Sequence, residues 1–379
     1  MSVSLKLLVW IARIVLGGVF IFSGFVKAID PLGSAYKFQD YFMAFNLDWL
    51  MFSALPSALL LSTLEFVIGI GILLGLKMRL SAWGGLLFMA VFTPLTLYIA
   101  ITDPVPDCGC FGDAIIISNW ATFNKNVFLL AAAIIVFVFR NKISPLLSKK
   151  ADGWLLLLFT IGILWLSVHC LRNLPIIDFR PWKTGNDITE LVMPTEEIAD
   201  TYLIFENTET GEIREYPADD YPWDDPEWAA VWEYKDRRDE VIQPYQEAKI
   251  EDFYIEDEFG DDLTGFYMTK PGYLFMVVAP DLHRSNTRAF EERVTPLAKE
   301  AEAMGYPLIV LTGSTQRTVD EFRHAYQTPY PFYLSDEIEL KTIIRSNPGL
   351  VLMKEGVVKG KWAHRNIPAL EEIMKETVN

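Results

Sequence analysis

The stretch Leu80-Ser-Ala-Trp-Gly-Gly-Leu-Leu-Phe-Met-Ala-Val-Phe-Thr-Pro-Leu-Thr-Leu-Tyr-Ile-Ala-Ile101 contains no Asp, Glu, Lys or Arg. About 20 mainly apolar residues form a helix that crosses a bilayer, because the hydrocarbon core is about 30 Å thick and each residue adds about 1.5 Å. Four further stretches meet this requirement: residues 5–29, 56–76, 120–139 and 153–171. The sequence therefore predicts a protein of the lipid bilayer with about five transmembrane helices.

Charge divides the 379-residue chain into two unlike halves. Residues 1–171 contain 11 Lys and Arg against 8 Asp and Glu, a net charge of +3. Residues 172–379 contain 22 against 41, a net charge of −19, which gives −16 for the whole chain. The acidic half argues against nucleic acid as a partner and against attraction to anionic membrane surfaces.

The basic residues of the membrane half predict its orientation. Cytoplasmic loops are enriched in Lys and Arg. The loops at residues 30–55 and 102–119 carry one Lys and six Asp. The basic residues at the opposite ends of the helices are Lys6, Lys77, Arg79, Arg140, Lys142, Lys149 and Lys150. We therefore predict a cytoplasmic N-terminus and, after five crossings, an acidic domain outside.

Two charged residues lie well inside the predicted spans. Arg13 lies roughly 12 Å, and Glu65 roughly 16 Å, from the cytoplasmic end of its helix. An unpaired charge at this depth costs about 3 kcal/mol or more, so we expect the two to pair or to share a polar pocket. The pair either fixes the bundle or forms a quinone or proton site. Gly69 and Gly71 allow close approach of another helix.

The segment Pro106-Asp-Cys108-Gly-Cys110-Phe-Gly-Asp113 lies in the outside loop between the third and fourth helices. A disulfide can persist in an oxidising compartment. A bridge across a single residue is strained and therefore easier to reduce, which suits thiol exchange. We predict Cys108 and Cys110 as a catalytic redox pair, with a permanent structural disulfide as the alternative.

Two cysteines cannot close a zinc site without further ligands, and we predict no metal site. The remaining cysteine, Cys170, follows His169 at the outer end of the last predicted helix. It is either a third redox thiol or a buried free cysteine.

Residues 13–31, residues 64–75 and the segment Cys108-Gly-Cys110-Phe-Gly112 together resemble the MauE/DoxX superfamily of small membrane proteins. The resemblance implies a four-helix membrane bundle, to which the fifth helix here is an addition. It implies redox work near quinones or disulfides, because MauE proteins accompany maturation of a disulfide-rich dehydrogenase and DoxX-type relatives are associated with thiosulfate:quinone oxidoreduction. It also implies a bacterial inner membrane, with a quinone as a possible cofactor.

The acidic half begins with an irregular stretch and continues with regular alternation. Residues 202–205 and 213–216, separated by a turn at Gly211, predict a β-hairpin. Asp225 followed by Pro226 predicts the start of a helix. From about residue 250, strand-like and helical segments alternate in the order βαβαβαββα, which predicts a mixed sheet covered by helices.

This alternation resembles the thioredoxin fold, and the segment from Asn347-Pro348 to Gly356 resembles its cis-proline loop, strand and turn. We therefore expect Pro348 to be cis. The place of the Cys-x-x-Cys reads Ala279-Pro-Asp-Leu-His283-Arg284-Ser-Asn286, without cysteine. A domain without thiols cannot exchange disulfides, so it is predicted to be a non-catalytic docking module. His283 and Arg284 either bind an anion or serve in capping and at the surface.

The predicted fold is thus an all-α membrane bundle followed by a soluble α/β domain. Its parts are residues 1–150 (four-helix domain), 151–172 (fifth helix), 173–249 (acidic linker and hairpin insert) and 250–379 (thioredoxin-like periplasmic domain). The predicted function is periplasmic thiol–disulfide or quinone-linked redox work, with a protein client or redox partner docked outside. The alternative is a non-enzymatic assembly or scaffold subunit.

Overall fold

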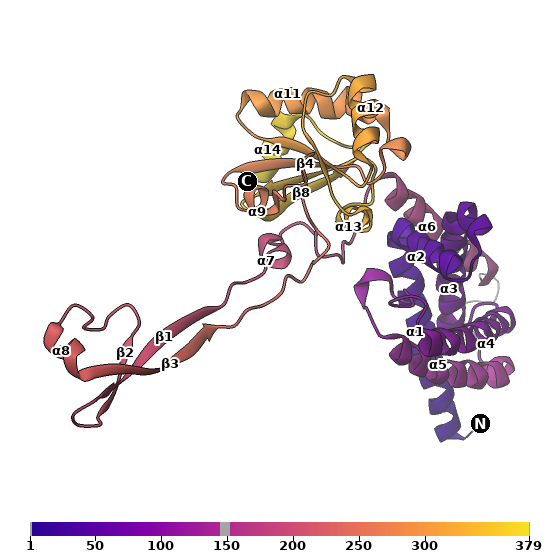
Figure 1. Cartoon of the computed structure of the whole chain (residues 1–379). Helices are drawn as coiled ribbons and strands as arrows, with labels where there is room; N and C mark the ends of the chain where they lie inside the picture. The colour runs from indigo at the N-terminus through magenta and orange to yellow at the C-terminus, as the bar shows by residue number, and fades with distance from the viewer. Residues whose placement is uncertain (1, 145–151, 379) are drawn as a thin grey trace.

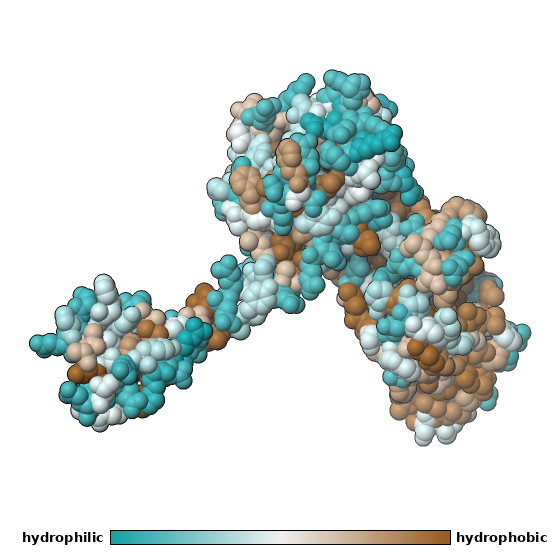
Figure 2. All heavy atoms as spheres, viewed as in Figure 1, coloured by the Kyte–Doolittle hydropathy of each residue, from teal (hydrophilic) through white to brown (hydrophobic). Residues whose placement is uncertain are grey.

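A computed structural model describes residues 2–144 and 152–378. It shows an N-terminal helical part, an α/β part and a long β arm that extends away from both (Figure 1). The surface of the helical part is largely apolar (Figure 2), as expected of helices that face lipid. Lys149, Lys150 and the predicted domain boundary at residue 150 lie outside the described residues.

Within the described residues, five helical segments are long and apolar enough to cross a membrane, which confirms the predicted number. The α-helices of these segments are α1 (Val3–Ile29), α3 (Ala54–Leu74), α4 (Met78–Thr102), α5 (Asn119–Phe139) and α6 (Asp152–Arg172). The orientation of this bundle in the membrane stays a prediction.

The segment between α1 and α3, predicted only as a loop, is itself helical. It forms α2 (Pro31–Ala44) and the 3-10 helix η1 (Asp48–Ser53). Asp30 caps α2, since its Oδ1 accepts a hydrogen bond from Gly33 N at 2.9 Å, and Pro31 occupies the first helical turn. Helix α2 packs on α3 and contributes to the pocket described below.

Glycines let α1 and α3 approach at backbone distance. A Cβ atom on Gly24 would lie 2.5 Å from Phe66 N, and one on Gly69 would lie 2.7 Å from Ile21 N. The expectation that Gly69 admits a neighbouring helix is therefore confirmed. Gly71 instead admits Ser81 of α4, whose Oγ would lie 2.1 Å from an added Cβ.

The α/β part is built on a mixed sheet, as predicted, with strand order β6-β5-β4-β7-β8. Strands β4, β5 and β6 are parallel, whereas β7 is antiparallel to both β4 and β8. The strands are β4 (Tyr273–Val278), β5 (Leu308–Thr312), β6 (Phe332–Leu334), β7 (Gly349–Lys354) and β8 (Val357–Ala363). The peptide bond Asn347–Pro348 is cis, as expected.

A separate hydrophobic core covers each face of the sheet. Side chains of α11 (Thr295–Ala303), α12 (Gln316–Tyr326) and α14 (Leu370–Val378) form the first core with alternate strand residues such as Phe275. The other alternate residues, such as Met276, form the second core with α13 (Glu337–Ile343). This alternation follows from the two-residue period of side chains along a strand.

The second core also contains Trp182 and Ile188, both fully buried. Both residues fall within the predicted linker and insert, residues 173–249. Trp182 packs edge-on against Phe253 and donates from Nε1 to Glu339 at 2.8 Å, so this segment belongs to the α/β part. It was missed because it is short and irregular.

The remainder of the insert forms the arm, a sheet of order β2-β1-β3. The predicted hairpin is confirmed as β1 (Ile198–Asn207) and β2 (Ile213–Pro217), and Asp225 caps α8 (Pro226–Val231) as predicted. Strand β3 (Trp232–Gln243) was not predicted, because both of its faces carry charged side chains. Its exposure on both faces explains the missing alternation.

We predict that Gly24→Ala destabilises the helical bundle by about 1–3 kcal/mol, because the new methyl group overlaps backbone atoms of Phe66 that cannot shift freely. Thermal unfolding of the detergent-solubilised protein measures the loss. The matched control is Gly18→Ala on the same helix, where no atom lies within 4 Å of the added Cβ. Equal stability of the two variants would contradict the close contact.

Candidate functional site

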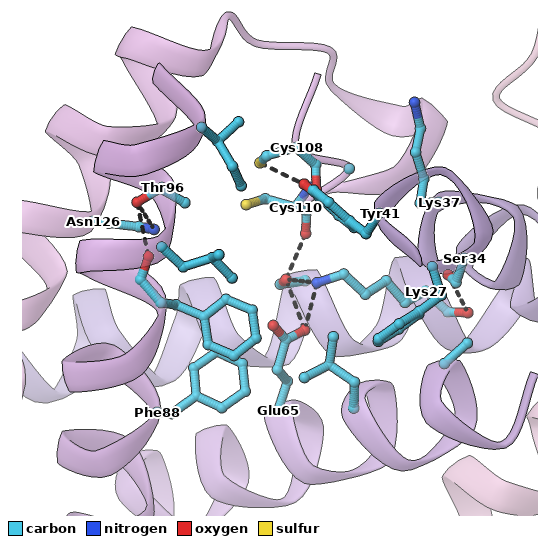
Figure 3. Close-up of a pocket in the computed structure, with 18 of the residues that line it drawn as sticks. Lys27, Ser34, Lys37, Tyr41, Glu65, Phe88, Thr96, Cys108, Cys110 and Asn126 are labelled. Carbon is cyan, nitrogen blue, oxygen red and sulfur yellow. Dashed lines mark hydrogen bonds and ion pairs between the residues drawn. The ribbon is translucent and has the colours of Figure 1, made fainter. Parts of the chain in front are cut away.

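A pocket of about 250 Å³ opens inside the helical bundle beneath the cysteine loop (Figure 3). Residues of α1 to α5 and of the loop line it. Its walls are mainly aromatic and aliphatic, and the aromatic residues are Phe20, Phe38, Tyr41, Phe42, Phe45, Phe88 and Phe92. Apolar walls with a few polar groups are typical of small-molecule sites.

The polar group at the centre of the pocket is a buried ion pair. Lys27 Nζ lies 2.7 Å from Glu65 Oε2, and both side chains are less than 10% exposed. Ser23 Oγ accepts from Lys27 Nζ at 2.8 Å. The same Oγ lies 2.9 Å from Glu65 Oε2 and 2.7 Å from the carbonyl oxygen of Cys110, so its single proton can be donated to either. The ion pair is thereby connected to the cysteine loop.

The expected partnership of Arg13 with Glu65 is wrong. Arg13 donates to the carbonyl oxygens of Ile72 and Leu73 at 3.2 and 2.9 Å, and its guanidinium lies over the ring of Trp10. It therefore satisfies the C-terminal end of α3, where carbonyl groups have no helical partner. Glu65 lies about two turns earlier in α3, beside Lys27 in the last turn of α1.

Sequence reasoning missed Lys27 as the partner of Glu65, because it stands in the last turn of α1 and resembles an interfacial residue. A usable signal was present: Ser23 and Lys27 are four residues apart and thus share one helix face.

The cysteine loop is held in shape by short hydrogen bonds. Asp107 Oδ1 accepts from Gly109 N at 2.8 Å, and Gly109 has the positive φ of +64° that glycine tolerates. Tyr41 donates to the carbonyl oxygen of Cys108 at 3.0 Å, and Lys37 pairs with Asp107 at 2.7 Å. The loop thus presents both cysteines to one end of the pocket (Figure 3).

Cys108 and Cys110 are half-buried free thiols with unlike acidities. Hydrogen bonds from the Cys110 thiol, from Thr122 and from Cys110 N, together with the charge of Lys125, lower the pKa of Cys108 to about 6. Donation of its proton to Cys108 and burial raise the pKa of Cys110. Cys108 is therefore the nucleophilic thiolate at neutral pH, and Cys110 holds the proton.

An arginine of the α/β part anchors this loop from outside. Arg345, whose side chain is 6% exposed, lies 2.9 Å from Asp30 Oδ2 and 3.0 Å from Asp113 Oδ2. Its guanidinium also lies over the ring of Tyr36, 5.4 Å from the centroid. No sequence pattern indicates this contact, since 315 residues separate Arg345 from Asp30.

The other predicted site residues lie away from the pocket. The loop of Asn347 and Pro348 does not line it; Asn347 donates to the carbonyl oxygen of Asp281 at 2.7 Å instead. Cys170 is a buried free cysteine in α6, as one of our two alternatives stated. His283 Nε2 lies 3.4 Å from Thr318 Oγ1 in the α/β part. Among the described residues, no three His, Cys, Asp or Glu side chains cluster as metal ligands do.

The apolar helices and the cysteine loop define an integral membrane protein. Residues 5–139 match the model of the family described as Methylamine utilisation protein MauE, which supports a membrane protein of the MauE type. Helix α6, the arm and the α/β part lie beyond the match. A comparison with curated proteins gives no match. The likenesses to DoxX proteins and to thioredoxin stay predictions.

We predict that Lys27→Met destabilises the protein by about 3–5 kcal/mol, because Glu65 is left as an uncompensated buried charge. The double variant Lys27→Met/Glu65→Leu removes both charges and should recover most of the loss. Thermal unfolding in detergent measures the stability of Lys27→Met, of Glu65→Leu and of the double variant relative to the unchanged protein. Strictly additive effects would show that the two side chains do not interact.

We predict that alkylation of Cys108 in the reduced protein follows a pH titration with a midpoint of about 6, because its lowered pKa makes the thiolate the main form above that pH. Alkylation of Cys110 should be slower than that of Cys108 throughout the titration, because its pKa is raised. Mass spectrometry of the peptides after short iodoacetamide pulses measures both. Thr122→Val should move the Cys108 midpoint upward, and a midpoint above about 8 in the unchanged protein would refute the assignment.

Proposed function

We propose that this protein is a membrane thiol–disulfide redox protein in which Cys108 and Cys110 cycle between dithiol and disulfide, with a quinone as the electron acceptor. The observation that carries the proposal is the position of the acidic Cys108 thiol at the end of an aromatic pocket that also contains Lys27 and Glu65. A reactive thiol beside a small-molecule pocket in the lipid phase suits a lipid-soluble oxidant.

The pocket fits a quinone ring. The rings of Phe20 and Phe88 have centroids 5.1 Å apart, and those of Phe88 and Phe92 lie stacked at 4.3 Å, which provides flat apolar walls. Lys27 and Asn126 place N–H donors in the lining, where carbonyl oxygens of a quinone need them. The volume of about 250 Å³ is close to the lower limit of about 300 Å³ for small-molecule sites, as a single ring requires.

The proposed step balances. The Cys108–Cys110 dithiol loses two electrons and two protons and becomes a disulfide, while one quinone gains both and becomes a quinol. Cys108 enters as the thiolate, having already released its proton to water. Cys110 then supplies one proton to the quinone, and the second proton of the quinol is taken up from water. Ser23 and Lys27 connect the carbonyl oxygen of Cys110 to Glu65 and can hold or pass a proton between loop and pocket.

A client dithiol would reduce the Cys108–Cys110 bridge again by thiol–disulfide exchange, so that electrons pass from client to quinone. A bridge across a single residue is strained and therefore a good oxidant of client thiols. In this proposal the N-terminus is cytoplasmic, the membrane is a bacterial inner membrane and the client is periplasmic.

We further propose that the α/β part is a thioredoxin-like module that docks the client or a redox partner. The strand order, with parallel β4 and β5 beside antiparallel β7 and β8 and helices on both faces, supports the likeness. Its segment at residues 279–286 has no cysteine, so it would not take part in exchange. Arg345 connects this module directly to the loop of Cys108 and Cys110 through Asp113.

The second candidate is an assembly or scaffold subunit in which Cys108 and Cys110 form a permanent bridge. The absence of cysteine from the α/β part and the exposed, strongly charged arm favour it. The redox state of Cys108 and Cys110 distinguishes the two candidates.

We predict that the reduced, detergent-solubilised protein converts ubiquinone-1 to its quinol, about one molecule for each cysteine pair oxidised. Absorbance follows the quinone, and mass spectrometry counts the remaining thiols. Cys108→Ala and Cys110→Ala should each abolish the reaction, whereas Cys170→Ala should leave it unchanged. In intact cells, differential alkylation should show the pair becoming more reduced when the respiratory chain is blocked.

If ubiquinone-1 is not reduced and the pair stays fully oxidised in blocked cells, the redox proposal fails and the scaffold candidate stands.

A further inference from the structure

A cationic cleft of about 420 Å³ lies where the end of α6 meets the α/β part. The end of α6 provides Arg172 and Asn173, and the segment after β8 provides Arg365. The start of the first long helical segment of the α/β part, residues 287–303, provides Arg288 and Arg293. This cleft is separate from the aromatic pocket beneath the cysteine loop, with which it shares no lining residue.

The charge of the cleft is opposite to that of the protein. Its lining, as far as the structure describes the chain, has four arginines and a single carboxylate, Glu292, whereas the whole chain has a net charge of −16. Glu292 pairs with Arg288 at 2.8 Å. In the part of the chain that the structure describes, neither Arg172 nor Arg365 has a carboxylate within ion-pair distance. Gathered cations repel one another, so the cleft is suited to an anion.

The cleft lies at the end of a helix that is long and apolar enough to cross a membrane, where lipid headgroups are expected. Arg172 is the last residue of α6, a helix of the length and composition that cross a membrane. Trp165, two turns earlier on the same helix, is 67% exposed, as tryptophans at the interface between hydrocarbon and headgroups are. Basic pockets beside transmembrane helices are known to bind phosphate-bearing headgroups such as that of cardiolipin.

The two parts of the protein are in direct contact at this cleft. Asn366 Nδ2 donates to Asn173 Oδ1 at 2.5 Å, which joins the segment after β8 to the end of α6. Arg293 donates from Nη1 to the carbonyl oxygen of Ile367 at 2.8 Å, which leaves its other N–H groups for a ligand. Arginine guanidinium groups bind phosphate oxygens in pairs, so Arg172 and Arg365 can each hold two oxygens of one phosphate.

We propose that this cleft binds a phosphate group, either in the headgroup of an anionic phospholipid or as a free phosphate. Bound phosphate would join the end of α6 to the α/β part and hold that part close to the membrane surface. The net negative charge of the acidic half repels an anionic surface, but the arginines of the cleft form a local positive patch that attracts one. The inference does not depend on the redox chemistry of Cys108 and Cys110.

The test uses the full chain in detergent and two probes. Native mass spectrometry with dioleoylphosphatidylglycerol, compared with dioleoylphosphatidylcholine, tests the lipid source. Thermal unfolding with inorganic phosphate in the absence of lipid tests the free anion. We expect phosphatidylglycerol to bind at least tenfold more tightly than phosphatidylcholine, and Arg172→Gln/Arg365→Gln to remove this difference.

Arg317→Gln/Arg323→Gln is the matched control, because both arginines are exposed on α12 and do not line the cleft. Arg172→Lys/Arg365→Lys keeps the charge but loses paired donation, and should bind with intermediate affinity. Loss of phosphatidylglycerol binding in the Gln variant assigns the lipid source. Stabilisation by inorganic phosphate alone, lost in the same variant, assigns free phosphate. If the folded Gln variant behaves as the wild-type protein with both probes, the proposal is overturned.

Discussion

A lysine and a glutamate inside a lipid-embedded helical bundle are stable only when they neutralise each other, and the centre of this protein is arranged around that constraint. The contact of Lys27 with Glu65 requires α1 and α3 to approach closely, which Gly24 and Gly69 permit. The same contact orients Ser23 toward the carbonyl oxygen of Cys110. The packing of α1 on α3, the neutralisation of the two charges and the position of the cysteine loop therefore depend on one another.

The two cysteines differ because their surroundings differ, although a single glycine separates them. Cys110 donates to Cys108, and Thr122 Oγ1, 3.4 Å from Cys108 Sγ, can donate to the thiolate, which favours the thiolate form of Cys108. Cys110 donates a hydrogen bond to Cys108 and is desolvated by burial, and both effects favour its thiol form. A pair of this kind shares one proton between two sulfur atoms.

The sequence was sufficient for features that depend on local pattern. Apolar length predicted the five spans, the turn at Gly211 predicted the hairpin, and alternation predicted the mixed sheet. Features that depend on contacts across the chain were missed or mistaken. Glu65 was assigned to Arg13 from their similar depths in neighbouring helices. This was wrong because distance from a helix end does not fix the register of two packed helices. Arg345 carries no pattern that distinguishes it from a surface arginine.

Arg345 has a consequence for how separable the two parts of this chain are. Its guanidinium neutralises Asp30, which starts α2, and Asp113, which follows the cysteines, so two segments of the membrane part are completed by a residue of the α/β part. Removal of the α/β part would leave two neighbouring carboxylates without their cation, repelling each other beside Cys108 and Cys110. The membrane part is therefore not structurally independent. Two of its carboxylates obtain their cationic partner only when the last third of the polypeptide has folded against it.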